Sequence, residues 1–297
     1  MLHDPATATS KRQAFRAGLA SGRLQRFPGA FNPLSAMLIA RHGFEGVYVS
    51  GAVIAADLGV PDIGLTTLSE VAARAAQIAR VTALPALVDA DTGFGEPMNA
   101  ARTVQVLEDA GAAGLHIEDQ VNPKRCGHLD GKQVADRETA VRRITAAVAA
   151  RRDPSFVIAA RTDAAAVAGL DEAISRARAY ADAGADLVFP EAMTGPADFE
   201  RVRAAVDVPI LANMTEFGKS ALLDATTLHN LGVNMVIYPV TLLRLAMHAA
   251  ETGLAEIAGR GTQEGLLGRM QHRRDLYDLL DYQGYAAFDT GIYNFRV

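Results

Sequence analysis

The chain has 297 residues, of which 49% are hydrophobic, with a formal net charge of −5 and one cysteine. This length suits one large α/β domain with a sizeable core, and without a basic excess a nucleic-acid partner is not expected. One cysteine cannot form an internal disulfide, which favours a reducing compartment, and no apolar run approaches the length of a membrane span. We therefore expect a cytoplasmic protein.

The first 26 residues are basic, with five Lys or Arg side chains and Asp4 as the single acid. Mitochondrial transit peptides share such a composition. An amphipathic surface helix from about Ser10 to Ser21, leading into the fold, explains the same residues, and we adopt this interpretation.

Short apolar stretches then alternate with helical ones. The expected strands lie near residues 27–32, 46–51, 85–91, 115–118, 156–163, 187–191, 209–216 and 235–239. The expected helices cover 33–42, 67–81, 97–110, 137–150, 171–183, 196–205, 219–231 and 241–252, while 52–65 is expected to be irregular. Apolar strands separated by helices are typical of a parallel sheet that is covered on both faces.

Eight strand–helix units in about 250 residues fit a (β/α)8 TIM-type barrel. An open doubly wound sheet is the alternative, but it requires a glycine-rich phosphate loop after its first strand, and Phe31-Asn32-Pro33 is not one. A barrel also gathers polar strand ends into one ring. The polar residues at the expected strand ends are Ser50, Asp89, Asp91, Glu118, Arg161, Asp163, Glu191, Asn213 and Thr215.

The helical tail 262–282 lies beyond what a barrel needs, so its apolar positions are expected to pack on the barrel or on a neighbouring subunit. No linker is long or polar enough to divide the chain. We expect a single barrel domain over 1–297, with a leading helix (1–26), a barrel core (27–255) and a C-terminal helical extension (256–297).

Asp89 and Asp91 are two positions apart on an expected strand, so both side chains point to one side. Two carboxylates this close repel each other unless a cation or a proton intervenes, and oxygen ligands suit Mg²⁺ or Mn²⁺. Glu118, at the next strand end, would add a third carboxylate directly or through water. A helix cap or a local salt bridge is the alternative role for Asp89.

Arg161 beside Asp163 is either a structural ion pair or a fork that holds a substrate carboxylate. Glu191 would orient a neighbour or pair with a cation. Asn213 and Thr215 share one side of their strand and would donate hydrogen bonds to an anion, or only satisfy the backbone at the rim. Two further residues lie inside apolar strands: His116, expected to be a satisfied core histidine, and Tyr48, expected to face the barrel interior.

The stretch Lys124-Arg125-Cys126-Gly127-His128 holds the single cysteine among cations, with Gly131 shortly after it. Nearby cations favour the thiolate, the form that takes and gives protons, whereas a lone cysteine is otherwise often buried and inert. A divalent metal, groups fit for carboxylates and a thiol acid together indicate metal-assisted carbon–carbon bond chemistry on a small di- or tricarboxylate.

Six stretches resemble the isocitrate lyase and phosphoenolpyruvate mutase superfamily. They are Val88–Gly95, Gly114–Gln120, Lys124–His128, Ala160–Asp163, Phe189–Ala192 and Pro209–Gly218. The resemblance runs in order from about Phe27 to Tyr285, so it covers most of the chain, and the Cys-Gly-His loop is typical of the lyase branch.

The resemblance implies Mg²⁺-dependent cleavage of a small tricarboxylate, 2-methylisocitrate, to pyruvate and succinate. It also implies C-terminal helices exchanged between the subunits of a homotetramer. Asp89 and Asp91 would be the metal-site carboxylates, with Asp62 and Glu118 nearby, directly or through water.

For the chemistry, the resemblance makes Cys126 the general acid that protonates the succinate enolate, and Tyr48 a base for the substrate hydroxyl. Glu118 would assist, and Lys124 and His128 would tune the thiol or bind the anion. The residues implied for substrate binding or for ordering the site are Ser50, Gly51, Ala52, Gly127, Arg161, Glu191, Asn213, Thr215, Arg244 and Arg273. Ala52 stands where some relatives have glycine.

Isocitrate lyase is the nearest alternative, because its substrate differs by one methyl group, worth only about 1–3 kcal/mol in a fitted pocket. Bacterial isocitrate lyases resemble this chain but carry long insertions that it lacks. An oxaloacetate decarboxylase or a phosphonopyruvate enzyme is a further alternative, although the phosphonopyruvate branch lacks the Cys-Gly-His loop. A non-catalytic barrel would have lost some of Asp89, Asp91, Glu118 or Cys126, and none is lost.

Overall fold

The computed structural model describes residues 6–127 and 131–293, and the chain divides into two units. The barrel unit is Ala6–Leu242, and the C-terminal unit begins at Leu243. One helix, α11 (Thr241–Arg260), spans the division between the two units, and residue 255, the expected end of the barrel core, lies within this helix. The single-domain organisation stays a prediction.

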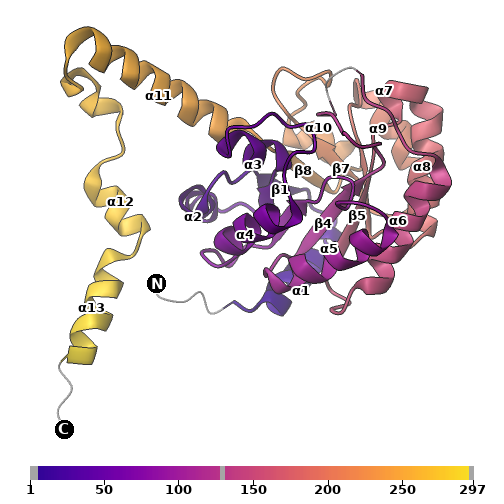
Figure 1. Cartoon of the computed structure of the whole chain (residues 1–297), viewed down its shortest axis with the longest axis horizontal. Coiled ribbons are helices and arrows are strands. Elements are labelled where there is room, and N and C mark those ends of the chain that lie inside the picture. Colours follow the sequence, from indigo (N-terminus) through magenta and orange to yellow (C-terminus); the bar gives the residue numbers. More distant parts are fainter. Residues whose placement is uncertain (1–5, 128–130, 294–297) are drawn as a thin grey trace. The chain divides into compact units, whose positions relative to one another are not determined.

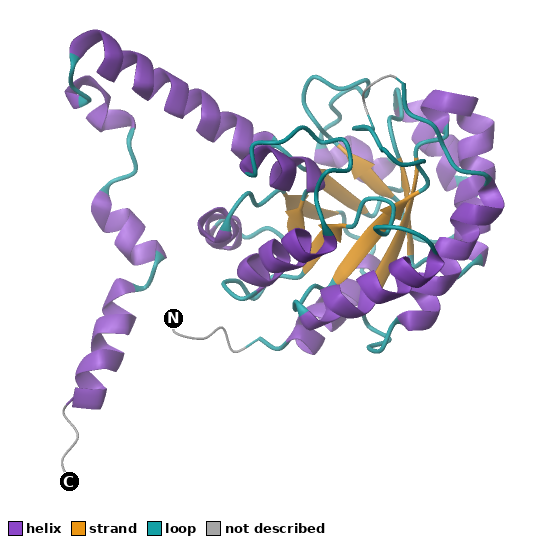
Figure 2. Ribbon diagram, in the orientation of Figure 1, coloured by secondary structure: helices purple, strands orange, loops and turns teal. Residues whose placement is uncertain are grey.

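Parallel strands form the centre of the barrel unit, and helices surround them (Figures 1 and 2). The strands are β1 Gln25–Pro28, β2 Val47–Val49, β3 Ala86–Asp89, β4 Gly114–Glu118, β5 Val157–Thr162, β6 Leu187–Pro190, β7 Leu211–Asn213 and β8 Met235–Tyr238. The helices of this unit are α1 Ala8–Ala20, α2 Pro33–Arg41, α3 Gly51–Asp57, α4 Leu68–Ala79, α5 Pro97–Asp109, α6 Arg137–Ala150, α7 Ala165–Ala168, α8 Leu170–Asp182, α9 Pro196–Arg203 and α10 Ala225–Asn230.

The strands close into a ring. β2 to β6 pair in chain order, β1 pairs with β8, and β8 pairs with β7. Two parallel bridges join these groups, from Gly29 to Tyr48 and from Val188 to Ile210. All the pairings are parallel, so the expected (β/α)8 barrel is confirmed.

The amino-terminal end of the barrel is closed by α1. Phe15 and Leu19 of this helix belong to the same buried cluster as the inward-facing strand residues, and the ring of Phe15 meets the ring of Phe27 edge-on at 5.0 Å. Lys11 and Arg12 are also buried, and they donate hydrogen bonds to backbone carbonyls. The described part of the basic leading segment therefore packs on the barrel, as the surface-helix interpretation requires.

Two sequence expectations about helices were wrong. The stretch 52–65 is not wholly irregular, because α3 occupies Gly51–Asp57 and buries Val53 and Ile54. The expected helix 219–231 shortens to α10, which begins after Asp224, whose side chain accepts a hydrogen bond from the Thr227 amide. The expected helix 67–81 corresponds to α4, which Thr67 caps in a capping box with Glu70.

The C-terminal unit is helical throughout its described elements. After α11 come a 3-10 helix, η1 (Glu264–Arg269), then α12 (Arg273–Leu279) and α13 (Tyr282–Tyr293). The expected helical tail 262–282 is therefore helical but divided into separate segments, and Asp281 adopts a left-handed φ of 55° between α12 and α13. In residues 6–127 and 131–293, no helix has both the length and the apolar character needed to cross a membrane.

Candidate active site

The carboxyl ends of the strands bring the predicted polar residues together. Strand register places Asp89 beside His116, and Glu118 beside Arg161. Glu191 follows the next strand, and its carboxylate contacts both Arg161 and Asn213. The predicted ring of strand ends therefore exists over β3 to β7.

The Asp89 carboxylate is held by backbone amides at the start of α3 and just after β3. The Gly51 amide donates to Oδ2 of Asp89 at 3.1 Å, and the Asp91 amide donates to Oδ1 of Asp89 at 3.0 Å. The Lys124 ammonium lies 2.7 Å from Oδ1 of Asp91 and also contacts Asp62. A buried cation thus bridges two of the predicted metal-site carboxylates.

Burial and mutual repulsion give the carboxyl groups of this cluster different pKa values. Burial raises the pKa of the Asp89 carboxyl, but the charges of His116 and Lys124 outweigh it and lower this pKa to about 2. Burial and the charge of Asp89 raise the pKa of Asp91 to about 6. Burial also raises the pKa of Glu118 well above its usual value. The cluster therefore holds more acids than its cations neutralise.

These carboxylates suit a divalent cation whose coordination is completed by other ligands. In the described part of the chain, no group of three or more His, Cys, Asp or Glu side chains is gathered closely enough to hold a metal ion alone. Oε1 of Glu118 is buried without a hydrogen-bond partner among the described residues. Mg²⁺ usually takes one or two carboxylates and fills its other positions with water and substrate, so Asp89 and Asp91 fit it.

Tyr48 faces the barrel interior, as expected, and contacts the buried His116. The hydroxyl of Tyr48 lies 2.8 Å from Nε2 of His116 and 3.5 Å from Oδ2 of Asp89. Burial lowers the pKa of His116 to about 4 and raises the pKa of Tyr48 well above 10. His116 is therefore neutral at pH 7, and the resting side chain of Tyr48 is a phenol.

Arg161 is the centre of a buried ionic network. Its Nε lies 2.9 Å from Oδ2 of Asp163 and 3.4 Å from Glu118, and its Nη1 lies 3.4 Å from Glu191. The Asn213 amide donates to Glu191 at 3.2 Å. Glu191 thus pairs with a cation, one of its two expected roles, while Asp163 orients the Arg161 fork.

The cysteine loop lies against this network. A β-carbon added at Gly127 would lie 2.4 Å from Nη2 of Arg161 and 2.5 Å from Cγ of Glu191, so only glycine permits this approach. Cys126 is half-buried. Gln120 fixes the loop backbone through two 2.8 Å hydrogen bonds with Arg125. The candidate thiol therefore lies one residue from the substrate-binding candidates.

For the remaining candidate site residues of the barrel unit, the structure gives mainly their burial and their place in the chain. Ser50 is buried in front of α3, Ala52 is half-buried within it, and Thr215 is buried just after β7. His128 lies outside the described residues. A cavity of about 470 Å³ opens beside Asp91, with Thr66, Asn99 and Arg102 among its lining residues.

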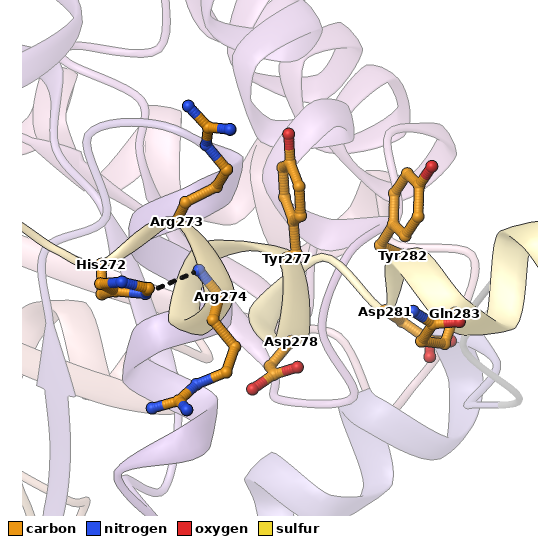
Figure 3. A pocket seen from close by; sticks show the side chains of 8 residues that line it. All are labelled: His272, Arg273, Arg274, Tyr277, Asp278, Asp281, Tyr282 and Gln283. Atoms are coloured by element: carbon orange, nitrogen blue, oxygen red, sulfur yellow. Dashed lines mark hydrogen bonds between the residues drawn. The ribbon is translucent and has the colours of Figure 1, made fainter.

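Arg244 and Arg273 belong to the C-terminal unit, so their role in substrate binding stays a prediction. Arg273 lines a pocket of about 470 Å³ made by the region of α12 and α13 (Figure 3). Its side chain points the same way as Tyr277 and Tyr282, whose rings stack with centroids 5.1 Å apart. All residues that line this pocket come from the C-terminal unit.

His116 is a core residue, as expected, and its Nε2 contacts the Tyr48 hydroxyl. Sequence reasoning gave no role to two other buried residues that organise the site. Asp119 accepts hydrogen bonds from Thr162 and from the Asp163 amide. Lys132 contacts Asp163. The sequence could have revealed the position of Asp119. Successive side chains of a strand point to opposite sides, so Asp119, which follows Glu118, points away from the ring of strand ends and toward the helices.

The profile of the phosphoenolpyruvate phosphomutase family matches residues 15–258, and the chain belongs to this family. Among curated relatives, a probable 2-methylisocitrate lyase 2 of Corynebacterium glutamicum is 65% identical over 97% of this chain and 94% of its own. The 2-methylisocitrate lyase of Escherichia coli is 46% identical over 96% of this chain and 95% of its own.

Two solved structures illustrate the fold match. A 2,3-dimethylmalate lyase aligns with a TM-score of 0.89 at 34% identity, over 97% of this chain and 96% of its own. A phosphonopyruvate hydrolase in complex with oxalate and Mg²⁺ aligns with a TM-score of 0.86 at 30% identity, over 94% of this chain and 98% of its own.

Proposed function

We propose that the protein is a carbon–carbon lyase that cleaves 2-methylisocitrate to pyruvate and succinate. The observation that carries this proposal is the packing of the cysteine loop, through Gly127, against the Arg161–Glu191 pair beside the acidic strand ends. This arrangement brings a thiol acid to groups that suit carboxylates. The 65% identity to a probable 2-methylisocitrate lyase supports the choice of substrate.

We propose Mg²⁺ as the cofactor, with Mn²⁺ as a substitute, held by Asp89 and Asp91 and assisted by Asp62 and Glu118 through water. Two observations support this assignment: Oε1 of Glu118 has no hydrogen-bond partner in the described part of the chain, and the acids repel each other. The Mg²⁺ in the phosphonopyruvate hydrolase complex supports it as well. When bound, the cation supplies positive charge that stabilises negative charge developing on substrate oxygens.

The substrate carboxylates would be held by cationic and amide groups around the barrel mouth. Arg161 is prepared for this role, because Asp163 and Glu191 fix its guanidinium before the substrate arrives. The full proposed binding set is Ser50, Gly51, Ala52, Gly127, Arg161, Glu191, Asn213, Thr215, Arg244 and Arg273.

The reaction needs one base and one acid. Tyr48 would remove the proton of the substrate hydroxyl, after which the carbon–carbon bond breaks to give pyruvate and the succinate enolate. Because Tyr48 rests as a phenol, this role requires positive charge nearby to lower its pKa when the substrate is bound. Cys126 would then give its proton to the enolate carbon, with Lys124 and His128 assisting.

We also propose a cytoplasmic homotetramer that exchanges its C-terminal helices between subunits. Among the described residues of the C-terminal unit, Leu279 is a buried apolar side chain, whereas Leu245, Leu254 and Phe288 are exposed. Apolar side chains of this kind usually pack against a partner.

The test is to incubate the purified protein with Mg²⁺ and either 2-methylisocitrate or isocitrate, and to measure pyruvate or glyoxylate respectively. We expect pyruvate to form much faster than glyoxylate. Glyoxylate at an equal or greater rate would move the assignment to isocitrate lyase. If neither product formed, activity on 2,3-dimethylmalate, phosphonopyruvate or oxaloacetate would identify another reaction.

A further inference from the structure

Lys132 is a buried cation that the proposed mechanism does not use. It is only 8% exposed, although it lies in a loop. Lysine is almost never buried unless its ammonium is paired. Here the ammonium donates to the backbone carbonyl of Gly127 and lies 3.0 Å from Oδ1 of Asp163. One side chain therefore joins the cysteine loop to the segment that follows β5.

The Asp163 end of this link is firmly held. Its backbone amide donates to Asp119 at 2.9 Å, and its carboxylate also binds Arg161. Asp119 in turn accepts hydrogen bonds from Thr162 at 2.7 Å and from Tyr180 at 2.8 Å. A buried network thus makes Asp163 a fixed anchor.

The Gly127 end of the link is one residue from the thiol. Its carbonyl is held by Lys132, while its α-carbon lies against Arg161 and Glu191. Fixing this residue on two sides restricts where the preceding residue, Cys126, can lie. A thiol that must reach one carbon of a bound molecule depends on such restriction.

We propose that Lys132 is a positioning residue that fastens the cysteine loop to Asp163 and so sets the position of the Cys126 thiol. The proposal rests on the proposed lyase function for its kinetic consequence. Without the fastening, Cys126 keeps its chemistry but spends less time near the reacting carbon. The turnover number therefore falls more than substrate affinity does.

The test compares Lys132→Met, which removes the ammonium, with Lys132→Arg, which keeps a cation. Arg142→Met, at an exposed cation on α6, is the matched control. Because a charged hydrogen bond is lost, we expect Lys132→Met to lower kcat roughly tenfold or more, with KM changed less than about threefold. Lys132→Arg should recover part of the loss, and Arg142→Met should match the parent.

The second readout needs no substrate. Cys126 is the single cysteine, so the rate of its alkylation by iodoacetamide reports how freely this thiol is presented. We expect Lys132→Met to raise this rate roughly tenfold, by the same loss of a charged hydrogen bond. If the parent cleaves no substrate, the proposed function fails, and the alkylation rate still decides the role of Lys132.

A folded Lys132→Met variant with parental kcat and parental alkylation rate would overturn the proposal. If Lys132→Met does not fold, as judged by its thermal transition, Lys132→Gln takes its place with the same readouts. Failure of both variants to fold would also overturn it, because Lys132 would then serve the fold rather than the thiol.

Discussion

The two ends of the barrel use buried cations in opposite ways. At the amino-terminal end, Lys11 and Arg12 donate mainly to backbone carbonyls, such as those of Ala79 and Ala112. At the carboxyl end, cations such as Lys124 and Arg161 meet carboxylates instead. At the amino-terminal end the cations are satisfied by the backbone, so this end offers few groups that could bind a ligand. At the carboxyl end, carboxylates remain that repel each other and can bind a cation. Stability is therefore concentrated at one end and chemistry at the other.

The largest expected effect is on turnover, at the carboxyl end. Cys126→Ser should fold and bind Mg²⁺, but kcat should fall by roughly 10²–10⁴, the usual contribution of a general acid. Steady-state kinetics on 2-methylisocitrate measure this, and the thermal transition serves as the control for folding. Near-parental turnover would contradict the role of the thiol.

A pair of glycine substitutions should distinguish the roles of the two ends of the barrel, catalysis at one and stability at the other. Gly127→Ala would press a methyl group against Arg161 and Glu191, so kcat should fall roughly 10²-fold because the site is displaced. Gly114→Ala would place its β-carbon 2.6 Å from the carbonyl oxygen of Val157. The free energy of unfolding should therefore fall by about 1–3 kcal/mol. Kinetics and urea unfolding of both variants measure the contrast. If both variants lost only stability, the division between the ends would be wrong.

The next prediction concerns the amino-terminal end alone. Arg12 donates to the carbonyls of Ala112 and Glu108 and pairs with Asp153 at 3.0 Å. Arg12→Met should lower the free energy of unfolding by about 2–3 kcal/mol, because these acceptors lose a charged donor. Urea unfolding measures the loss, and the kcat of the folded fraction should stay parental. A reduced kcat in that fraction would show that α1 also serves the active site.

The smallest expected change is a gain in stability. Because the pKa of Asp91 is raised from 3.8 to about 6, the folded protein holds this proton more tightly than the unfolded chain does. Its contribution to stability is therefore greatest below pH 4 and declines as the pH rises through 6. Asp91→Asn should stabilise the metal-free protein at pH 8 by about 1–2 kcal/mol.

Urea unfolding in EDTA between pH 4 and 8 tests this gain, with Asp171→Asn at an exposed acid as the control. The Asp91 variant should show a flatter dependence on pH than the parent. A variant less stable than the parent at every pH would mean that the Lys124–Asp91 pair outweighs the repulsion between the acids.

The sequence predicts the barrel and the acidic strand ends because both follow from local patterns. Asp89, Glu118 and Arg161 each end an apolar stretch, and parallel strands align such ends. The contact between Lys132 and Asp163 follows from no such pattern, because it joins a loop to a strand end 31 positions away. The contact between His116 and Tyr48 follows from no local pattern either, because the two residues lie 68 positions apart on different strands, although the core position of His116 itself was expected.

The pairing of β1 with β8 also determines the order in which the chain can fold. Gln25 pairs with Met235, 210 positions further along, so the first strand has no final partner on that side until nearly the whole barrel has been synthesised. Contacts between such distant residues slow folding, and intermediates exposing unpaired strands are prone to aggregation. A fragment that ends before β8 would leave β1 and β7 as open edges, the surfaces on which chains associate wrongly.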